Sequence, residues 1–172
     1  MASNLVFLQN EKTAGTVTSI SLSCFGKGYT AYQIVVKNNI GAADGNYVFA
    51  RFLDSSGSAI SDSEYWDAAS MLKAAGSFDE SWKRENGNLF APLWDDGDDD
   101  GLGGGLVMVV HNPDDSGSYT YANWQSAIYK VGEGLRGVKG IAYHASAEVI
   151  SGIQIVAYGS NREFDVTVYG VG

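Results

Sequence analysis

Hydrophobic and polar residues alternate along most of this chain, which is the pattern of β-strands with one buried face. Nine segments that lie between turn-forming residues are predicted as strands: residues 4–9, 17–25, 32–37, 47–53, 106–110, 119–124, 140–144, 153–158 and 164–171. Residues 106–110 are apolar at every position, so we expect a central strand that is buried on both faces. Residues 32–37 and 47–53 are expected to pair as an antiparallel hairpin.

Residues 61–75 depart from this alternation. Ser61 and Glu64 have the spacing of a capping box, which predicts a short helix. The same stretch also fits a strand or an ordered loop, because Tyr65 and Trp66 are aromatic residues of the kind enriched in strands. Both interpretations of this segment stay open.

The expected fold is an all-β, antiparallel, jelly-roll-like sandwich of about eight or nine strands, with one short helix if residues 61–75 form it. A length of 172 residues fits a single domain spanning residues 1–172. The 22 Gly and only 2 Pro favour many tight turns and bulges. Residues 76–105 are expected to form a long loop, of the kind that is functional or packed by its own aromatic side chains.

Charge and targeting signals narrow the possible partners. The formal net charge is −9, from 20 Asp and Glu against 11 Lys and Arg, which disfavours nucleic-acid binding because phosphate contacts depend on clustered Lys and Arg. The first residues lack the features of a signal peptide, and no stretch is long and apolar enough to span a membrane. Cys24 is the only cysteine, so we expect a buried, unpaired thiol.

An acidic run gives the sharpest local signal. Asp96, Asp98, Asp100 and Gly101 reproduce the opening of an EF-hand calcium loop. Val107 stands where such a loop needs a bidentate Glu, and the flanking segments are not helical, so an EF-hand is excluded. A solvated acidic turn is the preferred interpretation, with a looser calcium site at Asp96, Asp98 and Asp100 as the alternative.

Other candidate chemistry is sparse. His111 and His144 could share a metal only if the fold brought them together, so ordinary hydrogen-bonded histidines are preferred. Glu64 with Asp67, or the acidic pair at 79–80, would act as a glycosidase only with a defined separation across a cleft. The sequence contains no nucleophile elbow, phosphate-binding Gly loop or zinc-protease helix. We therefore expect no catalytic residues, no cofactor and no enzyme activity.

Aromatic residues are the remaining candidates for a binding surface. The chain has four Trp and ten Tyr, which could form sugar-stacking platforms, although most aromatic residues of an all-β domain pack in the core or in an interface. The candidates for partner contact are Trp82, Trp94, Tyr65 and Trp66.

Four segments carry a resemblance to known proteins: residues 29–38, an aromatic-led strand ending in Lys-Asn; 49–58, an Arg-Phe strand running into Asp-Ser-Ser-Gly-Ser; 112–126, which opens with Asn-Pro; and 164–171, which contains Tyr-Gly near its end. On these segments the chain resembles small structural proteins of tailed bacteriophages, especially those of marine and cyanobacterial phages. Residues 73–105 lie outside the resemblance. It implies a β-sandwich that works by contact, as a capsid decoration or cement protein, a head fibre or a tail-fibre module.

The expected function is therefore that of a non-enzymatic virion protein that binds and stabilises the outer capsid surface. The alternative is a tail-fibre or head-fibre module that binds a host surface glycan, and a polysaccharide hydrolase is a third class. Expected partners are capsid or other virion proteins and further copies of the chain, with a trimer as the specific hypothesis. The expected location is the outer surface of the phage particle, after synthesis in the host cytoplasm, and the acidic charge would keep the copies soluble before assembly.

Overall fold

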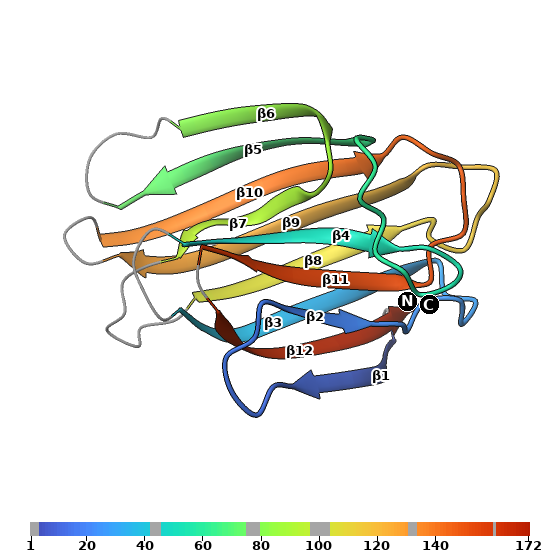
Figure 1. Ribbon diagram of the computed structural model, residues 1–172, viewed down its shortest axis with the longest axis horizontal. Helices are drawn as coiled ribbons and strands as arrows, with labels where there is room; N and C mark the ends of the chain where they lie inside the picture. The colour runs from blue at the N-terminus through green and yellow to red at the C-terminus, as the bar shows by residue number, and fades with distance from the viewer. Residues whose placement is uncertain (1–3, 42–45, 75–79, 97–103, 131–133, 160) are drawn as a thin grey trace.

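The computed structural model of the chain shows an all-β architecture (Figure 1). It describes residues 4–41, 46–74, 80–96, 104–130, 134–159 and 161–172. Within these ranges the side chains of residues 38–41, 46, 80–82, 91–96 and 130 are not described. The described residues form twelve strands and no helix, so the predicted antiparallel β-sandwich is confirmed.

Two antiparallel sheets make up the fold. The larger sheet has eight strands, in the spatial order β1 (Leu5–Lys12), β12 (Arg162–Val171), β3 (Ala31–Gly41), β8 (Gly104–His111), β9 (Thr120–Lys130), β10 (Gly134–His144), β5 (Tyr65–Lys73) and β6 (Glu80–Gly87). The smaller sheet has four, in the order β2 (Ser19–Leu22), β11 (Gly152–Tyr158), β4 (Asn46–Leu53) and β7 (Phe90–Asp96). The smaller sheet lies across the middle of the larger one in Figure 1, with β7 against β5, β8, β9 and β10.

Four of the strand pairings are nested along the chain. β1 pairs with β12, β2 with β11, β3 with β8, and β4 with β7. This nesting is the pairing of a jelly roll, in which one long antiparallel ribbon folds over into two layers, so the jelly-roll-like prediction is confirmed. The remaining strands β5, β6, β9 and β10 all join the larger sheet, which therefore extends beyond the jelly roll on one side.

Three strands lie where the sequence left the structure open or predicted a loop. Of the interpretations left open for residues 61–75, the strand is confirmed and the helix is wrong, because β5 occupies most of that segment. The long loop expected at residues 76–105 is also wrong in part, since β6, β7 and the start of β8 lie there. The strand count of eight or nine was too low for the same reason. β5 places the charged Asp67 on its buried face, and β6 is a polar edge strand, so neither shows the usual apolar alternation.

Two expectations about neighbouring strands are also wrong. Residues 32–37 and 47–53 belong to β3 and β4, which lie in different sheets, because the nested pairing sends successive strands to opposite layers. β8 lies inside the larger sheet as expected, but it is buried on one face only. Its residues Leu106, Met108 and Val110 face the core, whereas Val107 is exposed on the outer face of the sheet.

The core lies between the two sheets and is formed by the inward-facing residues of both. Phe52 of β4, Tyr65 of β5 and Phe90 of β7 meet there with ring centroids 5.3 to 5.9 Å apart, in the range expected of favourable aromatic pairs. Cys24 is buried, as predicted, and burial raises the pKa of its thiol to about 12.

Gly140 fixes the alignment of three central strands. It lies opposite Trp124 of β9 on one side and opposite Ala69 of β5 on the other. A Cβ atom at Gly140 would lie 2.5 Å from the Cε2 atom of Trp124 and 2.7 Å from the Cβ atom of Ala69. Trp124 is fully buried, so its indole has no free space to move into. Only glycine fits at this position of β10 without rearrangement of the core.

We therefore expect the substitution Gly140→Ala to lower the free energy of unfolding by roughly 1–3 kcal/mol through overpacking. The matched control is Gly137→Ala on the same strand, where the nearest atom to an added Cβ is the Ser126 carbonyl oxygen at 3.5 Å. Urea unfolding followed by tryptophan fluorescence measures both. Equal stability of the two variants would contradict the proposed role of Gly140.

Candidate functional site

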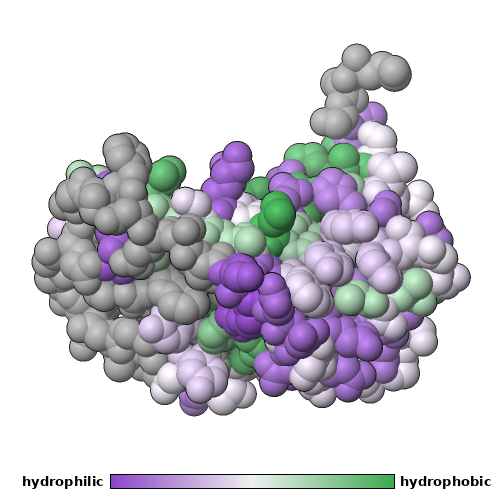
Figure 2. All heavy atoms as spheres, turned by 90° about the horizontal axis from the view of Figure 1, so that it is seen from above, coloured by the Kyte–Doolittle hydropathy of each residue, from purple (hydrophilic) through white to green (hydrophobic). Residues whose placement is uncertain are grey.

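A groove of about 500 Å³ lies on the outer face of the larger sheet, the face turned away from the smaller sheet. Its walls and floor come from β5, β6, β8, β9 and β10, so the strands that extend the jelly roll form most of it. Figure 2 looks onto the β6 edge and shows hydrophobic residues beside hydrophilic ones around a hollow. A concave, mostly apolar surface with a few polar groups is typical of a ligand site.

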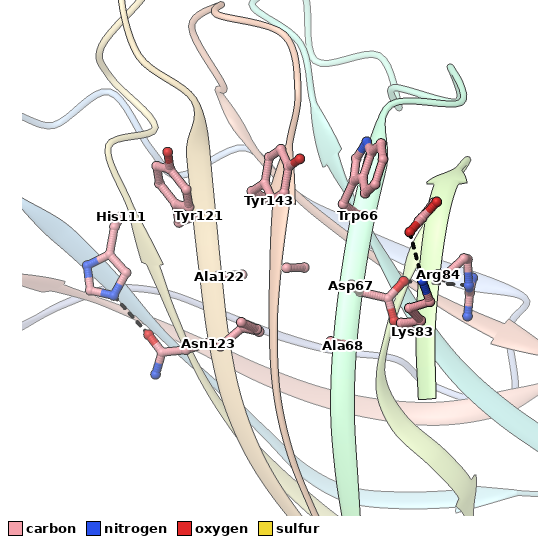
Figure 3. A pocket seen from close by; sticks show the side chains of 13 residues that line it. Trp66, Asp67, Ala68, Lys83, Arg84, His111, Tyr121, Ala122, Asn123 and Tyr143 are labelled. Carbon is pink, nitrogen blue, oxygen red and sulfur yellow. Dashed lines mark hydrogen bonds and ion pairs between the residues drawn. The ribbon is translucent and has the colours of Figure 1, made fainter. Parts of the chain in front are cut away.

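Three aromatic side chains form a row across this groove (Figure 3). Tyr143 of β10 lies opposite Trp66 of β5 and opposite Tyr121 of β9, because the three strands pair in register. The rings of Trp66 and Tyr143 are nearly parallel, with 14° between their planes and 6.2 Å between their centroids. The Tyr121 ring lies 6.0 Å from that of Tyr143 at 37°. Tyr119 adds a fourth ring, 5.8 Å from Tyr143 at 20°.

The next row of the sheet forms the floor of the groove. Ile141 of β10 lies opposite Ala68 of β5 and opposite Asn123 of β9. Ala68 lies between Ile141 of β10 and Lys83 of β6, and its small side chain leaves space between them, where Ile141 exposes most of its surface. The floor is therefore apolar beside Ala68 and polar beside Asn123.

Polar side chains stand at both ends of the groove. On the β8 side, His111 Nε2 and Asn123 Oδ1 are 2.9 Å apart and hydrogen-bonded. On the β6 side, Lys83 Nζ donates to Glu85 Oε1 at 3.1 Å. These groups supply hydrogen-bond donors and acceptors at the rim of an otherwise apolar surface.

Arg84 holds the β6 wall in place from the inner side of the sheet. Its Nε atom lies 3.5 Å from Oδ1 of the buried Asp67, and its Nη1 donates to the Leu89 carbonyl oxygen at 3.2 Å. The same guanidinium stands over the Phe49 ring of β4, 5.3 Å from the ring centroid. Because β6 is an edge strand, with β5 as its one neighbour among the described strands, these contacts fix the position of Lys83 and Glu85 in the groove.

Of the four aromatic residues predicted to contact a partner, the two with described side chains lie in different environments. Trp66 lies in the groove. Tyr65 was a wrong choice, because it is fully buried: its hydroxyl accepts from the Phe52 N–H at 2.8 Å and donates to the Ile60 carbonyl at 3.3 Å. The side chains of Trp82 and Trp94 lie outside the described residues.

The side chains of the predicted calcium site also lie outside the described part of the chain. Asp98 and Asp100 are not described, and Asp96 is described only as the end of β7, without its side chain. Within the described ranges no three His, Cys, Asp or Glu side chains gather as a metal site. His111 lies on the outer face of the larger sheet and His144 on its buried face, so the fold does not bring these two together.

Sequence reasoning missed Tyr121, Tyr143 and Ile141. The available signal was that β9 and β10 carry large apolar residues in both phases of their alternation, on the outer face as well as in the core. A strand with one face in the core does not need large apolar residues on its solvent-facing side, so their presence there indicates a binding surface. Their meeting with Trp66 depends on the register of strands far apart in the sequence, which the alternation does not reveal.

A second apolar surface lies on the edge strand β1, at the far side of the larger sheet from β6. Leu5, Val6 and Phe7 follow one another and expose 49%, 41% and 60% of their surface. Among the described residues β1 pairs only with β12, so its other edge carries unpaired backbone groups. The described part of the chain holds no helix that is long and apolar enough to cross a membrane.

Comparisons with known proteins do not assign the chain to a family. No family model and no curated protein matches the chain. Among solved structures, the chain is similar to the CBM2 module of the evolved Dit of Lactobacillus casei BL23 phage J-1, with 12% identity, 87% of this chain and 68% of that chain covered, and a TM-score of 0.24. A structure of infectious bursal disease virus, Gx strain, is similar over 99% of this chain and 39% of that chain, with 11% identity and a TM-score of 0.17. Neither likeness is strong enough to support a conclusion about function.

His144, next to Tyr143, generates a pH prediction. Burial lowers the pKa of His144 below its ordinary value of 6.5, although the nearby carboxylates of Glu148, Glu64 and Asp62 act in the opposite direction. Below pH 6.5 the unfolded chain then binds more protons than the folded one, so stability falls as the pH is lowered through 6.5.

The free energy of unfolding, measured at neutral pH and again about one unit below pH 6.5, should therefore fall more in the parent chain than in His144→Gln. An equal loss in both would show that other groups cause the acid sensitivity. Two carboxylates lie close to the imidazole that this substitution removes: Glu64 Oε2 at 3.4 Å and Glu148 Oε1 at 3.8 Å. The comparison therefore includes their effect on the protonation of His144.

Proposed function

We propose that this chain is a non-enzymatic structural protein of a tailed-bacteriophage particle, and that it decorates the outer capsid surface and reinforces it. The single observation that carries the proposal is the run of exposed apolar residues Leu5, Val6 and Phe7 on the open edge strand β1. The sequence resemblance to phage structural proteins and the jelly-roll sandwich agree with it.

The open edge of β1 is a surface that favours a partner. Edge strands of monomeric proteins are commonly protected by charged residues, whereas β1 begins with three exposed apolar side chains and has charges only at its far end, in Glu11 and Lys12. A partner that covers this edge gains apolar burial and backbone hydrogen bonds together. We propose that the partner is a capsid protein.

The body of the protein suits a role as a rigid clamp. Its strands are paired across two sheets around one buried cluster, and the described first and last strands β1 and β12 pair with each other. A formal net charge of −9 keeps separate copies apart before assembly and complements a basic surface on the capsid. Self-association, with a trimer as the specific form, belongs to the proposal and is measured by sedimentation.

A second candidate function is a tail-fibre or head-fibre module that binds a host surface glycan. The specific observation that favours it is the aromatic row of Trp66, Tyr143 and Tyr121 in the outer-face groove. The two functions use different surfaces, because β1 and the groove lie on different parts of the larger sheet. They can therefore be tested separately.

The capsid role is tested by adding purified protein to capsids of the phage that encodes it and measuring co-sedimentation. The double variant Val6→Lys, Phe7→Glu should weaken binding by at least about tenfold, because charged side chains would replace apolar contacts at the centre of the interface.

The control variant is Tyr158→Glu, which adds a charge at an exposed aromatic residue of the smaller sheet. Thermal melting checks that every variant is folded. Capsid binding that is equally strong with and without the β1 substitutions would refute β1 as the contact, and binding of the protein to isolated tails alone would refute the decoration role.

A further inference from the structure

We propose that the outer-face groove binds neutral pyranose units of a cell-surface polysaccharide, stacked on the row of Trp66, Tyr143 and Tyr121. The inference deepens the second candidate function and rests on it. It does not depend on β1, so capsid binding and sugar binding can fail independently.

The aromatic row offers an apolar surface that the C–H groups of a sugar ring can cover. A pyranose presents C–H groups on its faces and hydroxyl groups around its edge, so it can cover an aromatic ring while its hydroxyls reach polar neighbours. Tyr121 is exposed, and Trp66 and Tyr143 are half-buried, so all three reach the groove. Each of these side chains has only two torsions, which keeps the entropy cost of binding low.

The spacing of the row suits a ligand longer than one sugar. The ring centroids follow one another at 6.2 and 6.0 Å across β5, β10 and β9, so an extended saccharide that lies across the strands can contact more than one ring. The groove volume of about 500 Å³ is in the range of small-ligand sites, roughly 300–1,000 Å³. Strand pairing holds the rings in position before any ligand arrives.

Hydrogen-bonding groups stand where the hydroxyls of such a ligand would lie. The bond between His111 Nε2 and Asn123 Oδ1 occupies the amide oxygen of Asn123 and leaves its two N–H donors for another acceptor. Figure 3 shows this pair at one end of the row and Lys83 beyond Trp66 at the other. A ligand with hydroxyls around its whole edge can satisfy both ends.

The balance of charge favours a neutral sugar. Lys83 is paired with Glu85 at the rim, and Arg84 is paired with the buried Asp67, so each Lys and Arg among the described lining residues has a nearby carboxylate on β5 or β6. The formal net charge of −9 would repel a polyanion such as a teichoic acid or a uronic-acid polymer. A neutral hexose chain needs no unpaired cation in the groove and is not repelled by the negative charge of the protein.

A proline-rich peptide is the other ligand that aromatic grooves commonly bind. Such a peptide offers carbonyl acceptors but few donors, because proline has no N–H. It would leave the acceptors of Glu85 and of the tyrosine hydroxyls without new partners, whereas sugar hydroxyls both donate and accept. The groove therefore fits a saccharide better than a peptide.

The experiment measures binding of the full chain to immobilised oligosaccharides of glucose, galactose, mannose and N-acetylglucosamine, with uronic-acid and sialic-acid oligosaccharides and a proline-rich peptide as competing probes. Isothermal titration then gives the affinity for the best neutral probe. Tyr121→Ala should lower that affinity at least about tenfold, through loss of one stacking surface. Trp66→Ala should have a similar effect.

The matched control is Tyr129→Ala. Tyr129 lies on the same strand and the same face as Tyr121, outside the groove, and the two side chains are almost equally exposed, at 45% and 43%. Its substitution should leave sugar binding unchanged, and all three variants should keep the capsid binding of the parent chain. No binding to any neutral probe, tighter binding to the acidic probes or the peptide, or an affinity that survives both groove substitutions would overturn the proposal.

Discussion

The register of β10 with its two neighbours is the constraint on which the site depends. Side chains alternate between the two faces of a strand, so a slip by one residue would turn Tyr143 into the core and break the aromatic row. Gly140 prevents such a slip, because Trp124 and Ala69 occupy the space that any larger side chain would need. The same three strands therefore hold the buried tryptophan on one face and the aromatic groove on the other.

The topology explains why that outer face is available. A jelly roll needs only the four nested pairs of strands, and the two additional pairs β5–β6 and β9–β10 all join the larger sheet. Their inner faces are covered in part by β7, while their outer faces carry the groove. The second apolar surface, on β1, lies at the opposite edge of the same sheet. One sheet thus presents two separate apolar surfaces, so the proposed capsid contact and the proposed sugar site do not overlap.

Much of the fold follows from the sequence, because nine of the strands can be predicted from alternating or continuous apolar residues. The strand β5 could be predicted only as one of the open interpretations of residues 61–75, because Asp67 faces the core in partnership with Arg84 and interrupts the apolar alternation. The strand β6 was missed because it is a polar edge strand. The pairing of residues 32–37 with 47–53 failed since local signals cannot show that successive strands belong to different layers. Trp66 could be proposed from the sequence as a contact residue. Its alignment with Tyr143 and Tyr121 could not, because it depends on pairing between distant segments.

The central claim is that this protein works by contact at the outside of a particle, held by β1 and open at the groove. Cryo-electron microscopy of the intact phage tests it most directly, because the map gives both the position and the orientation of the chain. The account predicts density for the jelly roll on the outer capsid surface, with β1 against a neighbouring protein and the Trp66–Tyr143–Tyr121 row facing solvent. A chain inside the shell, or one whose groove is covered by capsid protein while β1 faces solvent, would contradict it.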